Sequence, residues 1–575
     1  MRKFFWFALA ILLLVLLFLA YRYLGVNKTV RQSAGEGTTG SDYVSSIIIP
    51  HFEGAKDSRQ EYLRQIAQTS DFKKIVLVST NHYSTGSADV VTCDQPFELK
   101  DSSTKPDLDI VKSLQNFAGA QNNKNAFLNE HGITAILPEI NSIFKPANIT
   151  PIIIKEGAPR AQVDKVFGAV KDSCNDCLLI SSIDFSHYNP DSLAQIHDLM
   201  SLSALYSMDQ EKALLAESDS PPVFYLTVKW AKAFGDQKFS LFKNSNSGKD
   251  ESNATLESVS YIIGSYSGQA QKPEDVATTF AFAGDMMLDR YVYHQFKDDL
   301  VKIFDKLGPR VFWGSDISFL NNEGPISDKP INDDYTANNL IFNFPPETPK
   351  VLQSVHVNGV SLANNHSLNA GSTIFSNTRN VLSDAKIKSC GSQNEVDENS
   401  VVKYEGDIPV SIVCFNELEN PSTDKISELV KTQKDTGRFV IVYPHWGNEY
   451  QSKHNDPQQK LAESLIDSGA DMIIGSHPHV VQDFGIYKGK PIIYSLGNLV
   501  FDQSFSQKTQ EGLIVAGVIK KDSVEISFLP TKQVNLQPVL ESDLKIKQSR
   551  ISEILDIENQ TGFTKVSSDT IKINR

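Results

Sequence analysis

The chain has 575 residues, of which 40% are hydrophobic and 22% are charged, and its formal net charge at pH 7 is -14. This length exceeds what one hydrophobic core supports, so we expect two or three domains. The acidic balance, without a basic stripe, argues against nucleic acid as a partner.

The N-terminus carries an apolar run from Phe4 to Tyr21, preceded by Arg2 and Lys3. The run is long enough to cross a bilayer once as a helix. Phe18 stands where a cleavable signal peptide needs a small residue. The pattern predicts a transmembrane signal anchor over 1–24, and hence a single-pass cell-membrane protein with an extracytoplasmic globular part. The polar, glycine-rich stretch 25–43 predicts a linker.

The next region, 44–266, alternates short apolar runs with helical patterns. Strand-like runs lie at 46–49, 75–78 and 178–181, and helical patterns at 58–68 and 193–206. This alternation predicts an α/β domain with a central sheet. The polar stretch 267–275 predicts a domain boundary.

The second region, 277–535, repeats this style and is followed by a predicted C-terminal tail, 536–575. The residues 511–530 alternate between apolar and polar, which predicts antiparallel hairpin strands. Buried strands are predicted at 279–283, 359–362, 410–415, 439–443, 472–474 and 491–494.

The five cysteines are too few for a disulfide-scaffolded fold. Cys93, Cys390 and Cys414 have no close cysteine neighbour in the sequence, and we expect small buried residues there. For Cys174 and Cys177, a local disulfide or a chance pairing is favoured over a redox or zinc site, because no second pair follows at zinc-ligand spacing.

Polar side chains follow six predicted strands of the second region. Loops at the carboxyl ends of strands in an open sheet converge, so these groups are expected to meet. Carboxylate, amide and imidazole ligands together suit manganese, zinc or iron. Two such metal ions would bind the attacking and the leaving oxygen in a phosphoryl transfer. The six segments are Gly284-Asp285, Asn322 to Pro325, Asn364 to His366, His445 to Glu449, Gly475 to His479 and Gly497-Asn498.

The ordered motifs Gly-Asp, Asn-Asn-His, His-Trp-Gly and Gly-x-His-Pro-His resemble the CapA family of poly-γ-glutamate capsule proteins, within the calcineurin-like metallophosphoesterases. The resemblance covers about 279–532 and implies an α/β/β/α sandwich. It also implies His366 as the catalytic acid or charge stabiliser, with Asn498 nearby. The metal ligands that it implies are Asp285, Glu323, Asn365, His445, His477 and His479, with Glu323 bridging.

One position departs from the wider superfamily, whose first motif is Asp-x-His. Here Asp285 is followed by Met286 and Met287. One of the two metal ions would therefore lack a ligand, so a site with a single metal ion is an alternative to a two-metal site.

The first region also carries histidines after its predicted strands. Its segments Pro50-His51, Asn81-His82-Tyr83, Asn129 to Gly132 and Ser181 to Tyr188 resemble the Memo family, called AmmeMemoRadiSam system protein B in bacteria. The family's fold is similar to that of extradiol dioxygenases. The resemblance implies that His51, His82 and His187 share a cleft suited to iron or copper, with His131 and Asp184 nearby. The family's cysteine is missing, because the corresponding stretch begins with Ser218.

These patterns favour a surface enzyme in which the C-terminal domain uses a divalent metal to act on a phosphoryl or related anionic group, in capsule or poly-γ-glutamate synthesis or export. One alternative is a non-catalytic, metal-dependent module that binds an anionic envelope polymer or the export machinery. Another is a Memo-type metal-dependent oxidoreductase with a regulatory C-terminal half. A purely structural role for the histidines is the remaining alternative.

Overall fold

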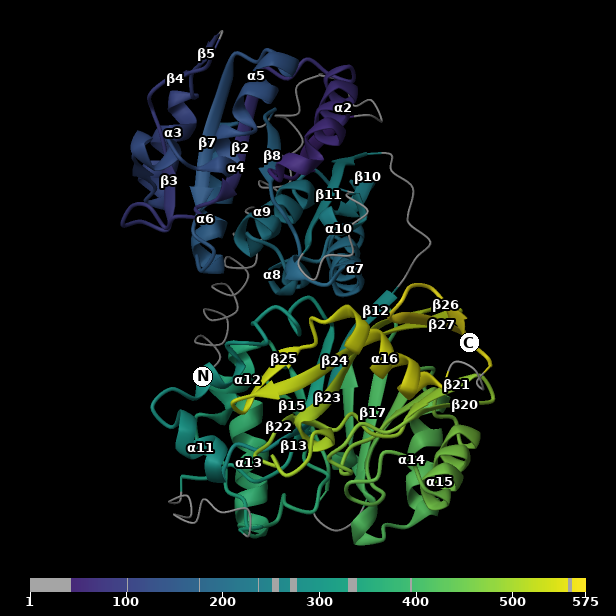
Figure 1. Cartoon of the computed structure of the whole chain (residues 1–575). Coiled ribbons are helices and arrows are strands. Elements are labelled where there is room, and N and C mark those ends of the chain that lie inside the picture. Colours follow the sequence, from purple (N-terminus) through teal and green to yellow (C-terminus); the bar gives the residue numbers. More distant parts are fainter. Residues whose placement is uncertain are drawn as a thin grey trace, which may run out of the picture.

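The computed structural model describes residues 43–100, 102–174, 176–235, 237–250, 258–268, 277–328, 339–392, 396–556 and 561–575. They form two α/β domains, one coloured purple to teal and the other teal to yellow in Figure 1. The polar stretch predicted as the boundary coincides largely with residues 269–276, which lie outside the described part.

The N-terminal domain is built on a 9-stranded sheet with the order β10-β11-β1-β8-β2-β7-β3-β6, to which β9 adds by pairing with β11. The middle strands β1, β8, β2 and β7 are mutually parallel, whereas β11 runs antiparallel to β1. The strands of this domain are β1 (Val44–Ile49), β2 (Lys74–Thr80), β3 (Val90–Thr92), β4 (Phe97–Glu98), β5 (Ser103–Thr104), β6 (Gln121–Asn122), β7 (Asn148–Ile154), β8 (Leu178–Ser182), β9 (His187–Asn189), β10 (Lys238–Asn246) and β11 (Ser258–Ser267).

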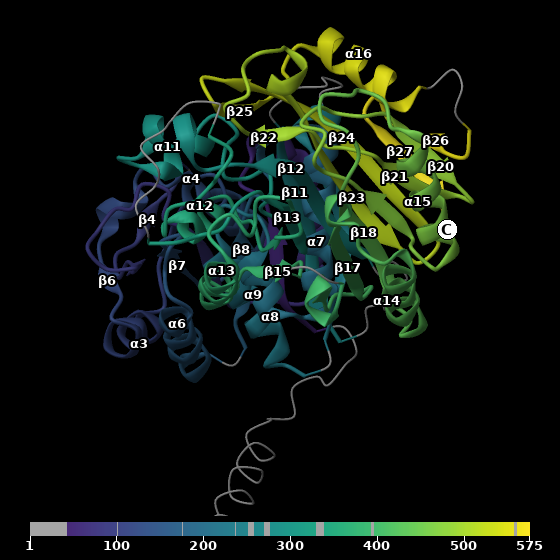
Figure 2. The same cartoon turned by 90° about the horizontal axis from the view of Figure 1, so that it is seen from below.

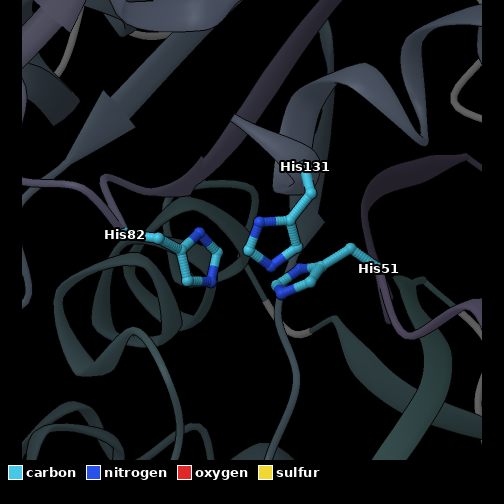
Figure 3. Close-up of side chains that lie close together, drawn as sticks. All are labelled: His51, His82 and His131. Atoms are coloured by element: carbon cyan, nitrogen blue, oxygen red, sulfur yellow. The ribbon is translucent and has the colours of Figure 1, made fainter. Parts of the chain in front are cut away.

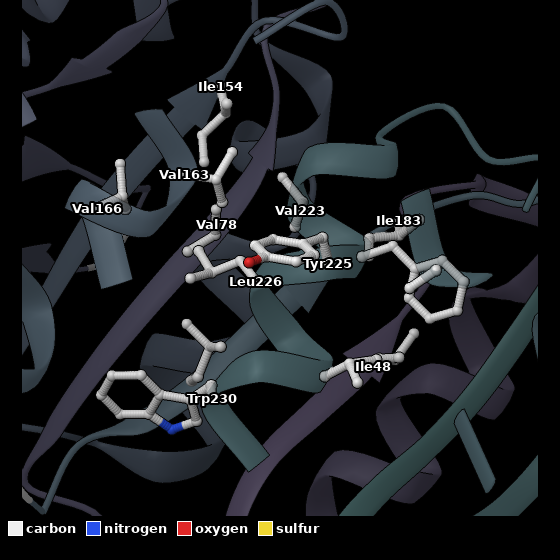
Figure 4. Packing of buried hydrophobic residues seen from close by; sticks show 14 of the residues in the cluster. Ile48, Val78, Ile154, Val163, Val166, Ile183, Val223, Tyr225, Leu226 and Trp230 are labelled. Carbon is white, nitrogen blue, oxygen red and sulfur yellow. The ribbon is translucent and has the colours of Figure 1, made fainter. Parts of the chain in front are cut away.

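Helices cover both faces of this sheet. Successive side chains of a strand point to opposite faces, so Ile48 packs with one helical layer while Ile47 and Ile49 pack with the other. Figure 4 shows part of the first core, where Trp230 and Leu226 of α9 pack near Ile48 and Val78. The helices are η1 (Glu53–Ala55), α2 (Lys56–Ala67), α3 (Leu108–Ala118), η2 (Lys124–Phe127), α4 (His131–Thr134), α5 (Leu137–Phe144), α6 (Arg160–Ser173), α7 (Asp191–Ser207), α8 (Gln210–Leu215), α9 (Pro221–Lys232) and α10 (Ser247–Asp250).

The C-terminal domain contains a 10-stranded and a 6-stranded sheet. In the larger sheet β12, β13, β14 and β15 are parallel, and β23 continues it antiparallel to β12. Its strands are β12 (Ala277–Met286), β13 (Ile317–Asn322), β14 (Gly359–Ser361), β15 (Lys388–Cys390), β22 (Asn498–Val500), β23 (Glu511–Lys520), β24 (Ser523–Val534), β25 (Gln537–Leu540), β26 (Thr564–Lys565) and β27 (Thr570–Asn574). The smaller sheet has β16 (Val401–Tyr404), β17 (Val410–Asn416), β18 (Phe439–His445), β19 (Met472–Ile474), β20 (Phe484–Tyr487) and β21 (Lys490–Ile493).

The two sheets pack face to face, with helices on the outside. Phe282 of β12 stacks on Tyr443 of β18 with ring centroids 6.0 Å apart. Helices α14 and α15 cover the outer face of the smaller sheet, as Figure 2 shows beside β17 and β18. The helices are α11 (Arg290–Phe296), η3 (Leu300–Phe304), α12 (Thr348–Ser354), α13 (Ser372–Asp384), η4 (Glu398–Ser400), η5 (Glu417–Glu419), α14 (Thr423–Asp435), α15 (Asp456–Asp467), η6 (Lys508–Gln510) and α16 (Leu544–Leu555).

Strands continue beyond residue 535, where the sequence predicts a tail. Both β25 and β27 pair antiparallel with β24, and α16 lies between them in the sequence. The cysteines differ in part from expectation: Cys174 bonds to Cys177, and the buried residues Cys390 and Cys414 also form a disulfide, while Cys93 is free.

The prediction of a transmembrane helix, and with it of a single-pass cell-membrane protein, is corrected. No helix in the described part of the chain is long and apolar enough to cross a membrane. The longest helix there, α7, has 17 residues and carries polar side chains along its length, whereas a span needs about 20 mostly apolar residues. The predicted anchor, 1–24, and the predicted linker, 25–43, lie outside the described residues except for Tyr43.

Helix α7 of the N-terminal domain packs against the C-terminal domain. Its residues Leu193 and Ile196 belong to the hydrophobic core of the C-terminal domain, together with Ala281 and Ala283 of β12. Ser192 of the same helix donates a hydrogen bond to Asp569 Oδ2 at 3.1 Å. The domains are therefore held together by both apolar and polar contacts.

Candidate metal centres

In the C-terminal domain, strand ends of both sheets bring the expected side chains together. Asp285 lies near the end of β12, Glu323 directly follows β13, and His445 is the last residue of β18. The parallel register of β12 and β13 places Asp285 beside Asn321. Because β18 belongs to the other sheet, the cluster lies where the carboxyl ends of the two sheets meet.

Gly284 allows the close approach that positions Asp285. A Cβ atom at this residue would lie 1.8 Å from Gly497 O, so only glycine fits between β12 and the start of β22. The Asp285 N–H donates to the same Gly497 oxygen at 2.9 Å. Asn498, the first residue of β22, accepts a hydrogen bond through its Oδ1 from His479 Nδ1 at 3.0 Å.

Two fully buried carboxylates form the centre of this cluster. Asn321 Nδ2 donates to Asp285 Oδ1 at 2.9 Å and to Glu323 Oε2 at 3.1 Å. His479 lies between the pair, with Nδ1 3.3 Å from Asp285 Oδ2 and Nε2 3.6 Å from Glu323 Oε1. Burial, and then the charge of Asp285, hold the pKa of Glu323 well above its usual value. Burial opposes the charged imidazolium, yet the carboxylates raise the pKa of His479 to about 9.

The remaining imidazoles are neutral in the absence of a cation. Burial lowers the pKa of His445 well below its usual value and that of His477 to about 4. Neutral imidazole is the form that binds metals. His445 Nε2 faces Asn365 Oδ1 at 2.9 Å, and its Nδ1 faces Ser476 Oγ at 3.1 Å.

The donor set fits a divalent cation. Among the described residues, Glu323 Oε1 and His477 Nδ1 are buried without a hydrogen-bond partner, an arrangement that is costly unless a ligand completes it. One set of ligand atoms within 4.8 Å of one another comes from Asp285, Glu323 and His479, and a second comes from Glu449, His477 and His479. Asn365 reaches the cluster through His445.

The sequence motifs did not point to Asn321, and they included Glu449 only within the segment His445 to Glu449, without a ligand role, although both residues belong to the cluster by contact. The feature of the sequence that could have identified Asn321 is its position directly before Asn322, which begins one of the six expected segments. His366 belongs to neither ligand group and stacks on Phe342 with ring centroids 4.1 Å apart. Burial lowers the pKa of His366 to about 4, so its ring is neutral at pH 7.

The N-terminal domain holds a second cluster, in which three histidine rings face one another (Figure 3). The ring centroid of His131 lies 4.9 Å from that of His51 and 4.0 Å from that of His82. His51 follows β1, His82 follows β2, and His131 opens α4. His187 lines the same cleft, but its Nδ1 faces Phe185 O at 2.6 Å and it is not part of this trio.

Asp219 lies at the meeting point of two rings. Its Oδ2 is 3.0 Å from His51 Nε2 and 3.4 Å from His82 Nε2. The other nitrogens of these rings have their own partners, because His51 Nδ1 faces Ser182 Oγ at 3.1 Å and His82 Nδ1 faces Glu130. Such outer partners orient metal-binding histidines. Two histidines and a carboxylate suit a divalent metal such as iron.

Sequence reasoning missed Asp219, because it examined Ser218 as the replacement for the family's thiol. Ser218 is fully buried, and its hydroxyl has no hydrogen-bond partner among the described residues. Asp184, expected nearby, accepts hydrogen bonds from the backbone of His51 and lies 3.3 Å from His51 Nε2. Although burial opposes its ionisation, the histidines lower the pKa of Asp219 below its usual value.

The fold and the two clusters define a two-domain α/β protein with a candidate divalent-metal centre in each domain. Comparison with known families gives these domains their names. Residues 279–503 match the family of the bacterial capsule synthesis protein PGA_cap, and residues 26–265 match the Memo-like protein family. The chain therefore combines a Memo-like domain with a CapA-like domain, as the sequence motifs predicted.

Individual relatives agree with this division. The chain is 27% identical over 308 residues to the PGA biosynthesis protein CapA of Bacillus subtilis, covering 49% of this chain and 80% of that protein. It is 30% identical over 266 residues to the capsule biosynthesis protein CapA of Bacillus anthracis, covering 42% of this chain and 64% of that protein. A MEMO1 family protein of Caldivirga maquilingensis is 22% identical over 234 residues, or 38% of this chain and 82% of that protein.

Proposed function

We propose that the C-terminal domain is a metal-dependent hydrolase that acts on a phosphoryl or related anionic group during capsule or poly-γ-glutamate synthesis or export. The observation that carries this proposal is the buried pair Asp285 and Glu323, which lies against His479 and leaves Glu323 Oε1 without a hydrogen bond. Two adjacent buried carboxylates are unfavourable without a cation. The names of the CapA relatives support the capsule role.

Asp285, Glu323, His477 and His479 would hold the metal, with Asn365 and His445 beside them. A bound manganese, zinc or iron ion would supply a Lewis acid for a phosphoryl oxygen. His366 lies next to this cluster with a neutral ring, which the negative charge of a bound phosphoryl group would bring closer to protonation. In this proposal His366 exchanges a proton with the substrate, and Asn369 Oδ1, 3.1 Å from its Nδ1, orients the ring.

The test is manganese-dependent hydrolysis of bis(p-nitrophenyl) phosphate by the full chain, with the metal content measured in each sample. We expect Glu323→Gln to lose both metal and activity, and His366→Ala to keep the metal while losing about 100-fold or more in rate. His294→Ala serves as control, because His294 is an exposed histidine of the same domain, on α11.

Activity that is unchanged in His366→Ala would contradict the role given to this residue. Bound metal without turnover of any phosphoester in the wild-type chain would reject the hydrolase. It would favour instead a metal-dependent module that binds an anionic envelope polymer.

A further inference from the structure

The histidine cleft of the N-terminal domain includes one residue of the other domain. Arg310, in the segment between η3 and β13, lines this cleft together with His51, His82 and Asp219. The cleft has a volume of about 650 Å³. Clefts of this size hold small organic molecules, so the space exceeds what a metal ion needs.

Contacts between the domains fix Arg310 at this wall. The guanidinium lies 5.1 Å from the ring centroid of Trp313, and Trp313 Nε1 donates a hydrogen bond to Leu215 O at 2.9 Å. Arg310 Nη1 donates to Glu217 Oε1 at 3.4 Å. Both acceptors belong to the N-terminal domain, at the end of α8 and in the loop that follows it.

The loop from α8 to α9 connects this docking to the candidate metal centre. Glu217 is fully buried and also faces His197 Nδ1 at 2.6 Å and Asn189 Nδ2 at 3.1 Å, so its position is fixed. Two residues further along the loop, Asp219 contacts His51 Nε2. The same short loop therefore holds the partner of Arg310 and the central carboxylate of the histidine cluster.

The guanidinium has donors left for a ligand. In the described part of the chain, Glu217 Oε1 is the one protein acceptor for Arg310, whose side chain is 24% exposed. The planar guanidinium presents five N–H donors in a fork that matches carboxylate or phosphate oxygens. The cleft also contains Lys155 as a cation and Asp89, Glu156, Asp184 and Asp219 as anions. Because the lining of the cleft carries both positive and negative side chains, its overall charge does not select an anion. An oxyanion would instead be bound by the guanidinium of Arg310 itself.

We propose that this cleft is a composite site of the two domains, which binds a small molecule through a carboxylate or phosphate group held by Arg310. The histidines and Asp219 face the same space and would hold a divalent metal beside that molecule. This inference is independent of the hydrolase proposed for the C-terminal domain, since none of its residues belongs to the Asp285 cluster.

The experiment is isothermal titration of the full chain with succinate and, separately, with inorganic phosphate, with and without Co²⁺. We expect Arg310→Gln to weaken binding of the preferred anion by about tenfold or more, the effect of losing a charge-assisted hydrogen-bonded pair. Co²⁺ affinity should change by less than about twofold, because Arg310 is not a ligand. A preference for succinate would identify a carboxylate ligand, and a preference for phosphate a phosphorylated one.

Two further variants distinguish the loss of anion binding by Arg310 from a disturbance of the contact between the two domains. Arg310→Lys keeps a cation for Glu217 but lacks the fork, so its anion affinity should lie between those of Arg310→Gln and the wild type. Arg64→Gln changes an exposed arginine of α2 and should bind the anion like the wild type. The proposal is overturned if the wild type binds neither anion at millimolar concentration, if Arg310→Gln binds as tightly as the wild type, or if Arg310→Lys does so.

Discussion

His479 lies between the carboxylates of Asp285 and Glu323 and is only 3% exposed. We expect His479→Ala to lower the affinity for Mn²⁺ by at least about tenfold, since a ligand is lost. The metal-free protein should also lose about 3 kcal/mol of stability, because the two buried carboxylates lose their cation. Metal titration and urea denaturation measure the two effects.

Lys488→Ala is the matched control for this change. Lys488 also has a left-handed backbone, with φ 47° against 56° for His479, but its side chain is exposed and pairs with Asp467. It therefore reports the strain of alanine at such a position without the loss of a ligand. An equal loss of stability in both variants would mean that backbone strain, and not the carboxylate pair, explains the effect.

A second residue-scale prediction concerns the ion pair of His454 with Asp483, whose Nδ1 and Oδ1 atoms are 3.1 Å apart. The hydrogen bond to Asp483 raises the pKa of His454, so the pair's stabilisation is complete below pH 6.5 and is lost as pH rises through the raised value. For Asp483, burial opposes ionisation but His454 lowers the pKa, so its contribution persists until the pH falls below 3.8. The pair therefore stabilises the fold most between about pH 4 and 6.5.

We expect His454→Phe to cost about 0.5 to 1 kcal/mol at pH 5.5, a value discounted for the partial exposure of the ring. At pH 9 the cost should vanish. Phenylalanine keeps a ring to stack on Tyr494, as His454 does at 3.9 Å between centroids. Denaturation midpoints at the two pH values, with Asp483→Asn in parallel, check this prediction, and a cost that is independent of pH would refute it.

At the scale of elements, the contact of β12 with the start of β22 determines where Asp285 lies. We expect Gly284→Ala to destabilise the protein by about 2 kcal/mol or more, because the new methyl group would overlap the Gly497 oxygen. Gly168→Ala in α6 is the control. A Cβ at Gly168 meets nothing within 4 Å, so alanine there should stabilise the helix by about 0.5 to 1 kcal/mol. Thermal unfolding compares the two, and a neutral Gly284→Ala would show that the strands can separate.

These elements also show what the sequence could predict. The apolar runs at 439–443 and 472–474 became β18 and β19, because a buried parallel strand needs little beyond a continuous apolar stretch. The histidines after them could be placed together for the same reason, since parallel strands present their carboxyl ends at one edge. Asp219 and Arg310 gave no such signal. Each lies in a loop outside any periodic pattern, and its role depends on contacts with residues far away in the sequence.

At the scale of the whole molecule, charged contacts near α8 fasten the two domains to each other. Lys212 Nζ lies 3.0 Å from Asp316 Oδ1 and 3.4 Å from Asp407 Oδ2, both in the C-terminal domain. Burial alone would lower the pKa of Lys212, but these two carboxylates raise it, so the ammonium stays charged. Asp316 also accepts hydrogen bonds from the backbone and hydroxyl of Thr279 at the start of β12. The contact therefore links α8 to the first strand of the larger sheet.

We expect Lys212→Met to destabilise this contact by about 2 kcal/mol, because a hydrogen-bonded charge is removed and its partners remain partly buried. For domains of this size such a loss lowers the unfolding temperature by roughly 5 °C. Lys431→Met is the matched control, since Lys431 forms an ion pair with Asp435 but is 66% exposed, and it should shift the transition by about 1 °C or less. Calorimetry of the full chain measures both shifts. Equal shifts would mean that the Lys212 contact contributes no more than a surface ion pair, and that the apolar packing of α7 holds the domains together.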